Sequence, residues 1–327
     1  MGLSALSKGL KGMSESFINK NDNYLTASPI DMLVEITNRC NHSCLFCAHH
    51  KMEQKQGEID SSLLRRILCE AYEMGLRRVG LYTTGEMFMC KNLEAHIRNA
   101  KEIGYEYIYS DTNGALASEE NLIKIISAGL DSIKFSINAG KKETYALIHG
   151  HDDFNKVIEN LKICHKLKFK MNPKLKILVS FVVTRQTEEE VELLSDMVTP
   201  YVDAFMPYPV QAFFQQYDYD LSHFKTEMYS DIEQGITIPC SMVMNRIHVT
   251  YDGFLSACCV DFNHDLLLAD LKKSSLSEAW TSENAIEFRR KHFLRKVEDT
   301  MCYGCSMGKF VPYSPLKIFP RTNKEDA

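Results

Sequence analysis

The sequence lacks several features that would define a class of protein at once. It has no apolar run of the roughly 18 residues needed to span a bilayer, and its first residues, MGLSALSKGLKGM, lack the long apolar stretch of a secretory signal. Leu6 stands where a myristoylation motif has Ser or Thr. A net charge of −5 gives no electrostatic reason to expect nucleic acid as a partner. We therefore expect a cytoplasmic protein with no membrane partner and no nucleic-acid partner.

The chain has the composition of an ordinary globular protein and an unusual distribution of cysteine. Its 327 residues are 45% hydrophobic and 25% charged, which suits one large domain plus a smaller one. Of its 11 cysteines, three lie at 40–47 and five at 240–305. In a reducing compartment, cysteines clustered in this way are metal ligands more often than disulfides.

The first cysteine group is the run EITNRCNHSCLFCAHH, in which Cys40, Cys44 and Cys47 have the spacing C-x3-C-x2-C. Three thiolates from one loop leave one iron of a cubane [4Fe–4S] cluster open to a non-protein ligand. The alternative is a zinc site whose fourth ligand is a histidine. The candidates for that ligand are His42, His49 and His50.

Between residues 30 and 210, β-prone runs alternate with segments of helical period, which predicts β/α units and a mainly parallel sheet. Polar residues gather just beyond the strand ends, where active sites of parallel barrels are built. Gly75, Gly104 and Gly129 are expected at helix ends, and Ser61 and Ser118 at helix starts. The expected strands are 32–37, 78–83, 105–111, 132–137, 176–183 and 204–206, and the expected helices are 61–75, 92–103, 119–129, 154–169 and 187–198.

After residue 210 the alternation stops, and a second cysteine group follows. A hairpin is expected over 246–251 and 254–260, joined by Asp252-Gly253, and then a helix over 275–297. The cysteines of this group read C-x12-G-x4-C and, after a gap, C-x2-C, and four thiolates suit either a fully ligated cluster or a structural zinc ion. The predicted units are an arm (1–30), a core (31–215), a bridging segment (216–235), a small metal domain (236–312) and a tail (313–327). The four expected ligands are Cys240, Cys258, Cys302 and Cys305.

The first motif resembles the radical S-adenosylmethionine (SAM) enzymes, whose C-x3-C-x2-C loop follows the first barrel strand, with an aromatic residue before the last cysteine (here Phe46). The resemblance implies an α/β fold, an open (β/α)6 partial TIM barrel, and a cluster-bound SAM that is cleaved to a 5′-deoxyadenosyl radical. Thr84-Gly85-Glu86 resembles the Gly-Gly-Glu motif that receives the methionine ammonium, with Thr84 as a departure. Ser136 and Asn138 resemble the ribose motif. His149 stands where an arginine often reaches the methionine carboxylate, and it would serve there if protonated or else cap a helix.

The second cysteine group is similar to the auxiliary-cluster extensions called SPASM and twitch, which implies a second [4Fe–4S] cluster. Within the family, its spacing resembles dehydrogenases of aminocyclitol or sugar alcohols, so we expect a radical SAM oxidoreductase with a small-molecule substrate. A flavodoxin or ferredoxin is the expected reductant. Sugar epimerisation, modification of a peptide or protein, and a non-catalytic zinc or iron–sulfur module remain as alternatives. Four further candidates for substrate chemistry are Cys90 and Cys259, as hydrogen donors, and Arg185 and Tyr208.

Overall fold

The computed structural model describes residues 28–210, 240–294, 296–303 and 305. Within this part of the chain one nine-stranded sheet runs in the order β6-β5-β4-β3-β2-β1-β7-β8-β9. Most of the predicted arm (1–30), the predicted bridging segment (216–235) and the predicted tail (313–327) lie outside the described residues.

Six strands form the parallel half of the sheet, and they follow the chain from one edge toward the middle. Each pairs in parallel with its neighbour, so that Ser136 of one strand lies beside Ser180 of the next. The predicted open six-stranded β/α architecture is therefore confirmed. The strands are β1 (Asp31–Val34), β2 (Arg78–Gly80), β3 (Tyr107–Thr112), β4 (Ser132–Ser136), β5 (Lys176–Val183) and β6 (Ala204–Pro209).

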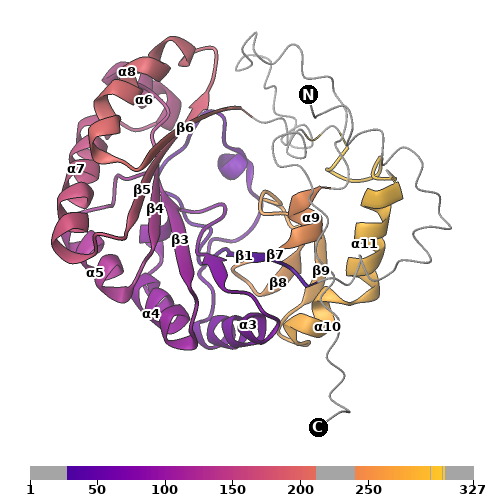
Figure 1. The fold of residues 1–327 in the computed structure, drawn as a ribbon. Helices are drawn as coiled ribbons and strands as arrows, with labels where there is room; N and C mark the ends of the chain where they lie inside the picture. Colours follow the sequence, from indigo (N-terminus) through magenta and orange to yellow (C-terminus); the bar gives the residue numbers. More distant parts are fainter. Residues whose placement is uncertain (1–27, 211–239, 295, 304, 306–327) are drawn as a thin grey trace, which may run out of the picture.

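Helices cover the outer side of these strands, as Figure 1 shows. Gly104 and Gly129 end two of them in the left-handed conformation, at φ 114° and 103°, as the sequence predicts. Ser118 caps its helix as expected, but Asp60 rather than Ser61 caps the first one, because its carboxylate accepts two backbone N–H groups. The helices are α3 (Ser61–Glu73), α4 (Leu93–Ile103), α5 (Glu119–Ala128), α6 (Lys142–His149), α7 (Phe154–Met171) and α8 (Val191–Val198).

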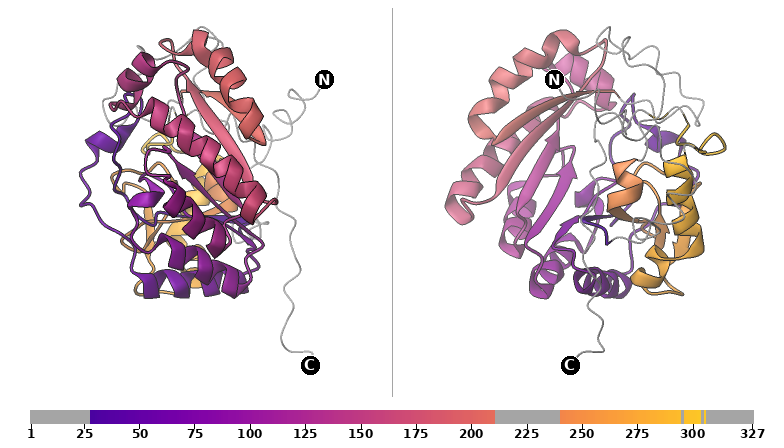
Figure 2. Two further views of the ribbon diagram at one scale, coloured as in Figure 1. Left: turned by 90° about the vertical axis from the view of Figure 1, so that its left-hand side faces the viewer. Right: turned by 45° about the vertical axis from the view of Figure 1, so that its right-hand side comes forward.

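The C-terminal third continues the same sheet. Strand β7 (Arg246–Val249) pairs in parallel with β1, and the predicted hairpin joins it antiparallel to β8 (Phe254–Ser256), which pairs with β9 (Leu267–Asp270). Figure 2 shows this part beside the parallel strands, with its helices on the flank. These helices are α9 (Ser241–Asn245), α10 (Leu276–Trp280) and α11 (Glu283–Leu294).

Two elements differ from the expectations. The predicted helix over 275–297 is divided into α10 and α11, because Ser282 starts a new turn by accepting the N–H groups of Ala285 and Ile286. Helix α6, which ends at His149, was not among the predicted helices. Short 3-10 turns add η2 (Ala48–Lys51), η3 (Met87–Met89), η4 (Glu188–Glu190) and η5 (Thr199–Tyr201).

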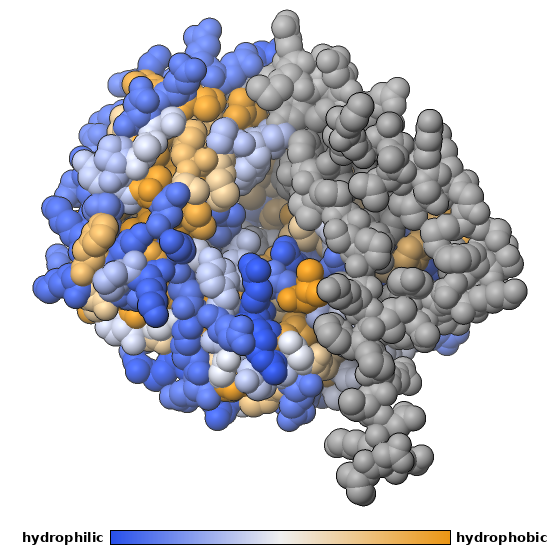
Figure 3. Space-filling view, in the orientation of Figure 1, coloured by the Kyte–Doolittle hydropathy of each residue, from blue (hydrophilic) through white to orange (hydrophobic). Residues whose placement is uncertain are grey.

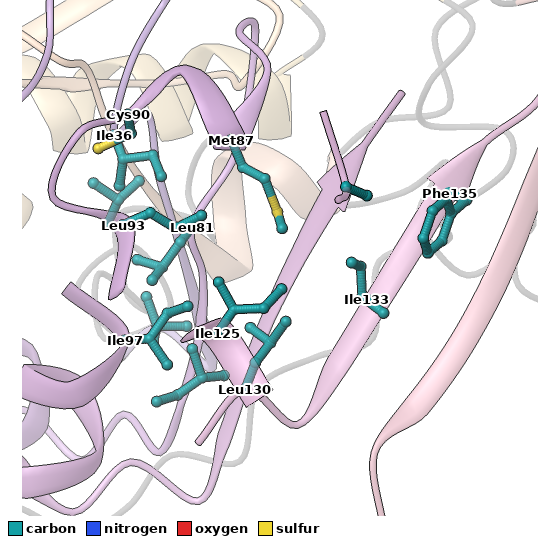
Figure 4. Packing of buried hydrophobic residues seen from close by; sticks show 14 of the residues in the cluster. Ile36, Leu81, Met87, Cys90, Leu93, Ile97, Ile125, Leu130, Ile133 and Phe135 are labelled. Atoms are coloured by element: carbon teal, nitrogen blue, oxygen red, sulfur yellow. The ribbon is translucent and has the colours of Figure 1, made fainter. Parts of the chain in front are cut away.

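The main hydrophobic core lies between the sheet and the outer helices, and Figure 4 shows part of it around Leu81, Ile97 and Ile133. On the face seen in Figure 3, the described rim is mostly hydrophilic, and hydrophobic side chains gather over β5 and β6. None of the helices in the described ranges is long and apolar enough to cross a membrane.

Candidate functional site

The first cysteine loop follows β1 and is fastened to the end of α6. The N–H groups of Ser43 and Leu45 donate to the carbonyls of His149 and Ile148, at 3.2 and 2.9 Å. Burial, and then the neighbouring Cys47 and Cys40 thiols, raise the pKa of Cys44 well above its ordinary value. The thiols of Cys40 and Cys47 therefore lie near that of Cys44, as ligands of one metal group must.

Gly85 lies where the strand-end loop after β2 touches the segment that leads from β1 to the first cysteine. A Cβ atom at Gly85 would lie 2.7 Å from the carbonyl oxygen of Arg39 and still closer to that of Thr37. Beside it, the N–H of Glu86 donates to the Arg39 carbonyl at 2.8 Å. The position thus requires glycine because two backbones meet there.

The Glu86 carboxylate is buried and held in one orientation. It accepts from the hydroxyl of Thr112 and the N–H of Asn113, both at 2.7 Å, and from the N–H of Phe88 at 3.2 Å. Burial raises the pKa of Glu86 to about 7, although these hydrogen bonds act to lower it. The Thr84 hydroxyl does not join these contacts, because it donates to the Glu35 carboxylate. Contacts of Thr84, Gly85, Glu86 and Phe46 with SAM stay predictions.

Of the three residues predicted near the ribose and the carboxylate of SAM, Asn138 and His149 contact each other. Ser136 contacts Ser180. The Ser136 hydroxyl lies 3.2 Å from that of Ser180. Asn138 places its amide nitrogen 3.2 Å from His149 Nε2 and accepts from the N–H of Val182 at 2.7 Å. Both Asn138 and His149 are buried, at 2% and 0% exposure. Their predicted contacts with SAM remain untested.

Neither expectation for the His149 ring agrees with its surroundings. Burial, and then His42, lower the pKa of His149 well below the ordinary value, so the ring is neutral and offers no charge to a carboxylate. It does not cap α6 either, because its nitrogens face Asn138, His42 and Cys44. The alternative zinc ligands are also engaged, His42 with Asp153 and His49 with the Asn38 carbonyl.

The four residues proposed for substrate chemistry occupy different environments. Cys90 is 4% exposed in the hydrophobic core, beside Ile36 and Leu93 in Figure 4, so the structure gives no support to its role as a hydrogen donor. Arg185 is exposed after β5. Tyr208 packs against the apolar cluster of Ala48, Val182, Val210 and Phe262, and so do Phe46 and Cys47 of the first cysteine loop.

The second cysteine group also converges. Burial raises the pKa of Cys302 to about 12, with contributions from the neighbouring Cys305 and Cys240 thiols. A hydrogen bond to Cys259, then burial, raises the pKa of Cys258, and Cys305 adds to it. Cys240, Cys258 and Cys302 pack against the small hydrophobic cluster of Val243, Met244, Ala257 and Leu266. Cys305 lies near enough to Cys258 and Cys302 to affect their pKa values.

An apolar cluster bridges the two cysteine groups. Val182 and Val210 pack with Phe262 of the C-terminal part, and Cys47 and Val260 pack against them. A hydrogen bond with Cys258 lowers the pKa of Cys259, although burial opposes this, and His248 and Arg246 lower the pKa further. The Cys259 thiol therefore lies near Cys258 of the second group and near two basic side chains.

The structure also brings together charged residues of the barrel interior that the sequence did not pair. In β3 every second side chain is less buried, so Tyr107, Tyr109 and Asp111 face the barrel interior. Asp111 forms an ion pair of 2.6 Å with Lys134 of β4, and both side chains are 21% exposed. Deeper in, Asp31 pairs with Arg246 at 2.8 Å. The one available indication was a lysine inside the otherwise apolar strand SIKFS.

The fold and the site together define a class of metal-cluster enzyme. Its barrel is open, a three-thiol loop follows the first strand, and a four-thiol group lies on an extension of the sheet. The sequence model of the radical SAM superfamily matches residues 34–198, and that of an iron–sulfur cluster-binding domain matches residues 240–306. The protein belongs to the radical SAM superfamily and carries a C-terminal SPASM domain.

Individual relatives cover most of the chain at low identity. A probable GTP 3′,8-cyclase of Saccharolobus solfataricus is 26% identical over 310 residues, covering 82% of this chain and 97% of that protein. The crystal structure of BtrN with AdoMet and 2-DOIA has a TM-score of 0.59 at 18% identity, covering 84% and 92%. Streptococcus suis SuiB bound to its precursor peptide SuiA has a TM-score of 0.66 at 13% identity, covering 89% and 72%.

The residues present fit the cofactors of this family, which are two [4Fe–4S] clusters and SAM. Three half-buried cysteines in one loop suit a cluster with an open iron, and four in the extension suit a fully ligated one. The enclosed carboxylate of Glu86, beside the backbone contact at Gly85, suits an ammonium group. Cysteine ligation in both groups therefore agrees with the family.

Proposed function

We propose that the protein is an oxidoreductase that dehydrogenates an alcohol of a sugar-like or aminocyclitol-like molecule inside the barrel. The observation that carries this proposal is the ion pair of Asp111 and Lys134 on the inner faces of β3 and β4. Opposite charges held 2.6 Å apart, and still partly exposed, offer both a hydrogen-bond acceptor and donors to a hydroxylated or amino-bearing substrate.

The position of the pair suits a substrate next to SAM. Lys134 and Ser136 lie on the same face of β4, two residues apart, which corresponds to about 7 Å along a strand. Ser136 is the residue predicted to face the ribose. A molecule bound to Lys134 and Asp111 would therefore lie directly beneath the adenosyl end of the cofactor.

The pair can also take up the proton that alcohol oxidation releases. When bound, SAM and the two clusters supply a radical that takes one hydrogen atom and an acceptor for one electron. The hydroxyl proton has to go to the protein. Burial raises the pKa of Asp111, although Lys134 opposes this, so its carboxylate is a better base than an exposed aspartate.

The test uses anaerobically reconstituted enzyme with SAM, a reductant and a panel of aminocyclitols and hexoses. Asp111→Asn is expected to lower carbonyl product by about 10²–10⁴-fold, the usual contribution of a general base, and to leave SAM cleavage without substrate unchanged. Glu120→Gln, which removes a carboxylate from the surface pair with Lys124, is the matched control. Full product formation by Asp111→Asn would exclude this carboxylate as the base.

Epimerisation of a sugar carbon is the second candidate, and the position of Cys259 favours it. Its thiol lies near enough to Asp111 and Lys134 to affect their pKa values, and a hydrogen donor to a substrate radical has to lie near the substrate. Cys259→Ala separates the two reactions. An epimerase would lose the returned hydrogen and stop producing epimer, whereas a dehydrogenase would retain its product.

GTP and a cysteine-containing peptide belong in the same substrate panel, because one relative is named a probable GTP cyclase and a structural neighbour holds a peptide. Among the described residues, the interior cations Lys134 and Arg246 are each paired with a carboxylate, which disfavours a triphosphate. Cyclisation of GTP without oxidised product would replace this proposal. The proposal also includes a flavodoxin or ferredoxin as the reductant. It includes a cytoplasmic location, which the free cysteines favour.

A further inference from the structure

His149 occupies an unusual place, because its ring is enclosed against the first cysteine loop. Its Nδ1 atom lies 3.6 Å from Cys44 Sγ and 3.3 Å from His42 Nδ1. The ring is fully buried and stacks on Tyr145, with centroids 4.0 Å apart. The ligand atoms of His42, Cys44 and His149 all lie within 4.8 Å of one another, so the rings act on the cysteine either as hydrogen-bond partners or as metal ligands.

The contacts of Nε2 determine which nitrogen of His149 carries the proton. The backbone N–H of Asn138 points at Nε2 from 3.3 Å, and the Asn138 side-chain nitrogen lies 3.2 Å from the same atom. A backbone N–H can only donate, so Nε2 accepts and has no proton. The ring proton is therefore on Nδ1, the nitrogen that faces Cys44.

His42 is a second acceptor near the same proton, because its Nδ1 lies 3.3 Å from His149 Nδ1. Its Nε2 lies 3.3 Å from the Asp153 carboxylate, which can only accept from it. The Nε2 proton of His42 is thereby fixed, and its Nδ1 presents a lone pair toward His149. Asp153 and His42 thus keep the His149 proton on Nδ1, where it lies between two acceptors, His42 Nδ1 and Cys44 Sγ. A cysteine that binds a cluster is a thiolate, and its negative charge makes it the stronger acceptor of the two.

We propose that His149 is a positioning residue that donates its Nδ1–H to the Cys44 sulfur and thereby raises the reduction potential of the cluster held by this loop, with His42 and Asp153 fixing the tautomer. Hydrogen bonds to ligand sulfurs are among the factors that set the potentials of iron–sulfur clusters. The inference rests on membership of the radical SAM superfamily and on this geometry, and it is independent of the proposed substrate.

The first test is a redox titration of the first cluster, followed by electron paramagnetic resonance, in a Cys240→Ala background that removes the auxiliary cluster. A hydrogen bond to a charged group contributes enough to change the reduction equilibrium about tenfold. We therefore expect His149→Phe to shift the potential by about 59 mV in the negative direction for a one-electron couple. His149→Asn keeps an N–H near the Nδ1 position and should restore most of the wild-type value. His165→Asn, on the outer helix α7, is the control and should change nothing.

A second measurement keeps the test decisive if His149→Phe does not assemble a cluster. Protein labelled with [15N]histidine should show one weak nitrogen coupling to the reduced cluster by spin-echo modulation. Asp153→Asn, at a partly exposed side chain, should shift the potential in the same direction by a smaller amount. Two results would overturn the proposal. The first is a strong nitrogen coupling, which would mean that a histidine nitrogen is bonded directly to iron. The second is an unchanged potential in Asp153→Asn together with no histidine coupling in the wild-type protein.

Discussion

Replacing Gly85 by alanine tests whether the two strand-end loops must touch backbone to backbone. The added methyl group would lie 2.7 Å from the Arg39 carbonyl oxygen and closer to that of Thr37, where ordinary contact begins at 3.4 Å. Since both obstacles are backbone, no side chain can rotate away, and the loops have to separate by about 1 Å. Overpacking of this kind costs about 1–3 kcal/mol of the free energy of unfolding.

The same displacement would disturb the cofactor site, because the Glu86 N–H donates to Arg39 from the adjacent residue. A misplacement of about 1 Å can cost on the order of 10²-fold in rate. We expect Gly85→Ala to lose stability in urea unfolding and to form 5′-deoxyadenosine about 10²-fold more slowly. Gly75→Ala, at φ +97° with open space around it, is the control and should lose about 1–2 kcal/mol from strain while cleaving SAM normally. Wild-type stability and SAM cleavage in Gly85→Ala would refute the requirement for contact.

Two further predictions concern the C-terminal part. Reconstituted protein should hold about eight irons and Cys240→Ala about four; an iron count unchanged by the substitution would remove Cys240 from the ligand set. Burial lowers the pKa of His292, which is 1% exposed on α11, to about 4, against about 6.5 in an unfolded chain. Its stabilising contribution is complete above pH 6.5 and is lost as the pH falls toward 4, by about 2 kcal/mol between pH 7 and pH 5. Urea unfolding at both pH values should show this loss, and His292→Phe should abolish it.

Local features of the fold could be predicted from the sequence because short spacings determine them. Strand β5 covers the predicted residues 176–183, and Gly104 and Gly129 end their helices as expected. The cysteine spacings predicted two sets of candidate ligands, and the structure brings members of each set near one another. The hairpin across Asp252-Gly253 was equally predictable.

The features that were missed depend on contacts between distant residues. His149 is 105 residues from Cys44, and nothing in YALIHGHDDF indicates that its ring turns toward the cysteine loop. Asp111 and Lys134 were missed as a pair because strand register, rather than sequence, brings them side by side. Only the fold determines which side of a strand faces the barrel interior when both sides are covered.

The parallel pairing of β1 with β7 has a consequence for how the chain is made. Residues 31–34 pair with residues 246–249, so the edge of β1 that faces β7 has no partner until the last third of the chain has left the ribosome. Contacts of such long sequence separation form slowly, and an open strand edge can pair with other chains. A fragment ending near residue 210 would expose this edge permanently. The C-terminal part therefore covers one edge of the parallel strands, and we expect a fragment ending near residue 210 to aggregate more readily than the whole chain.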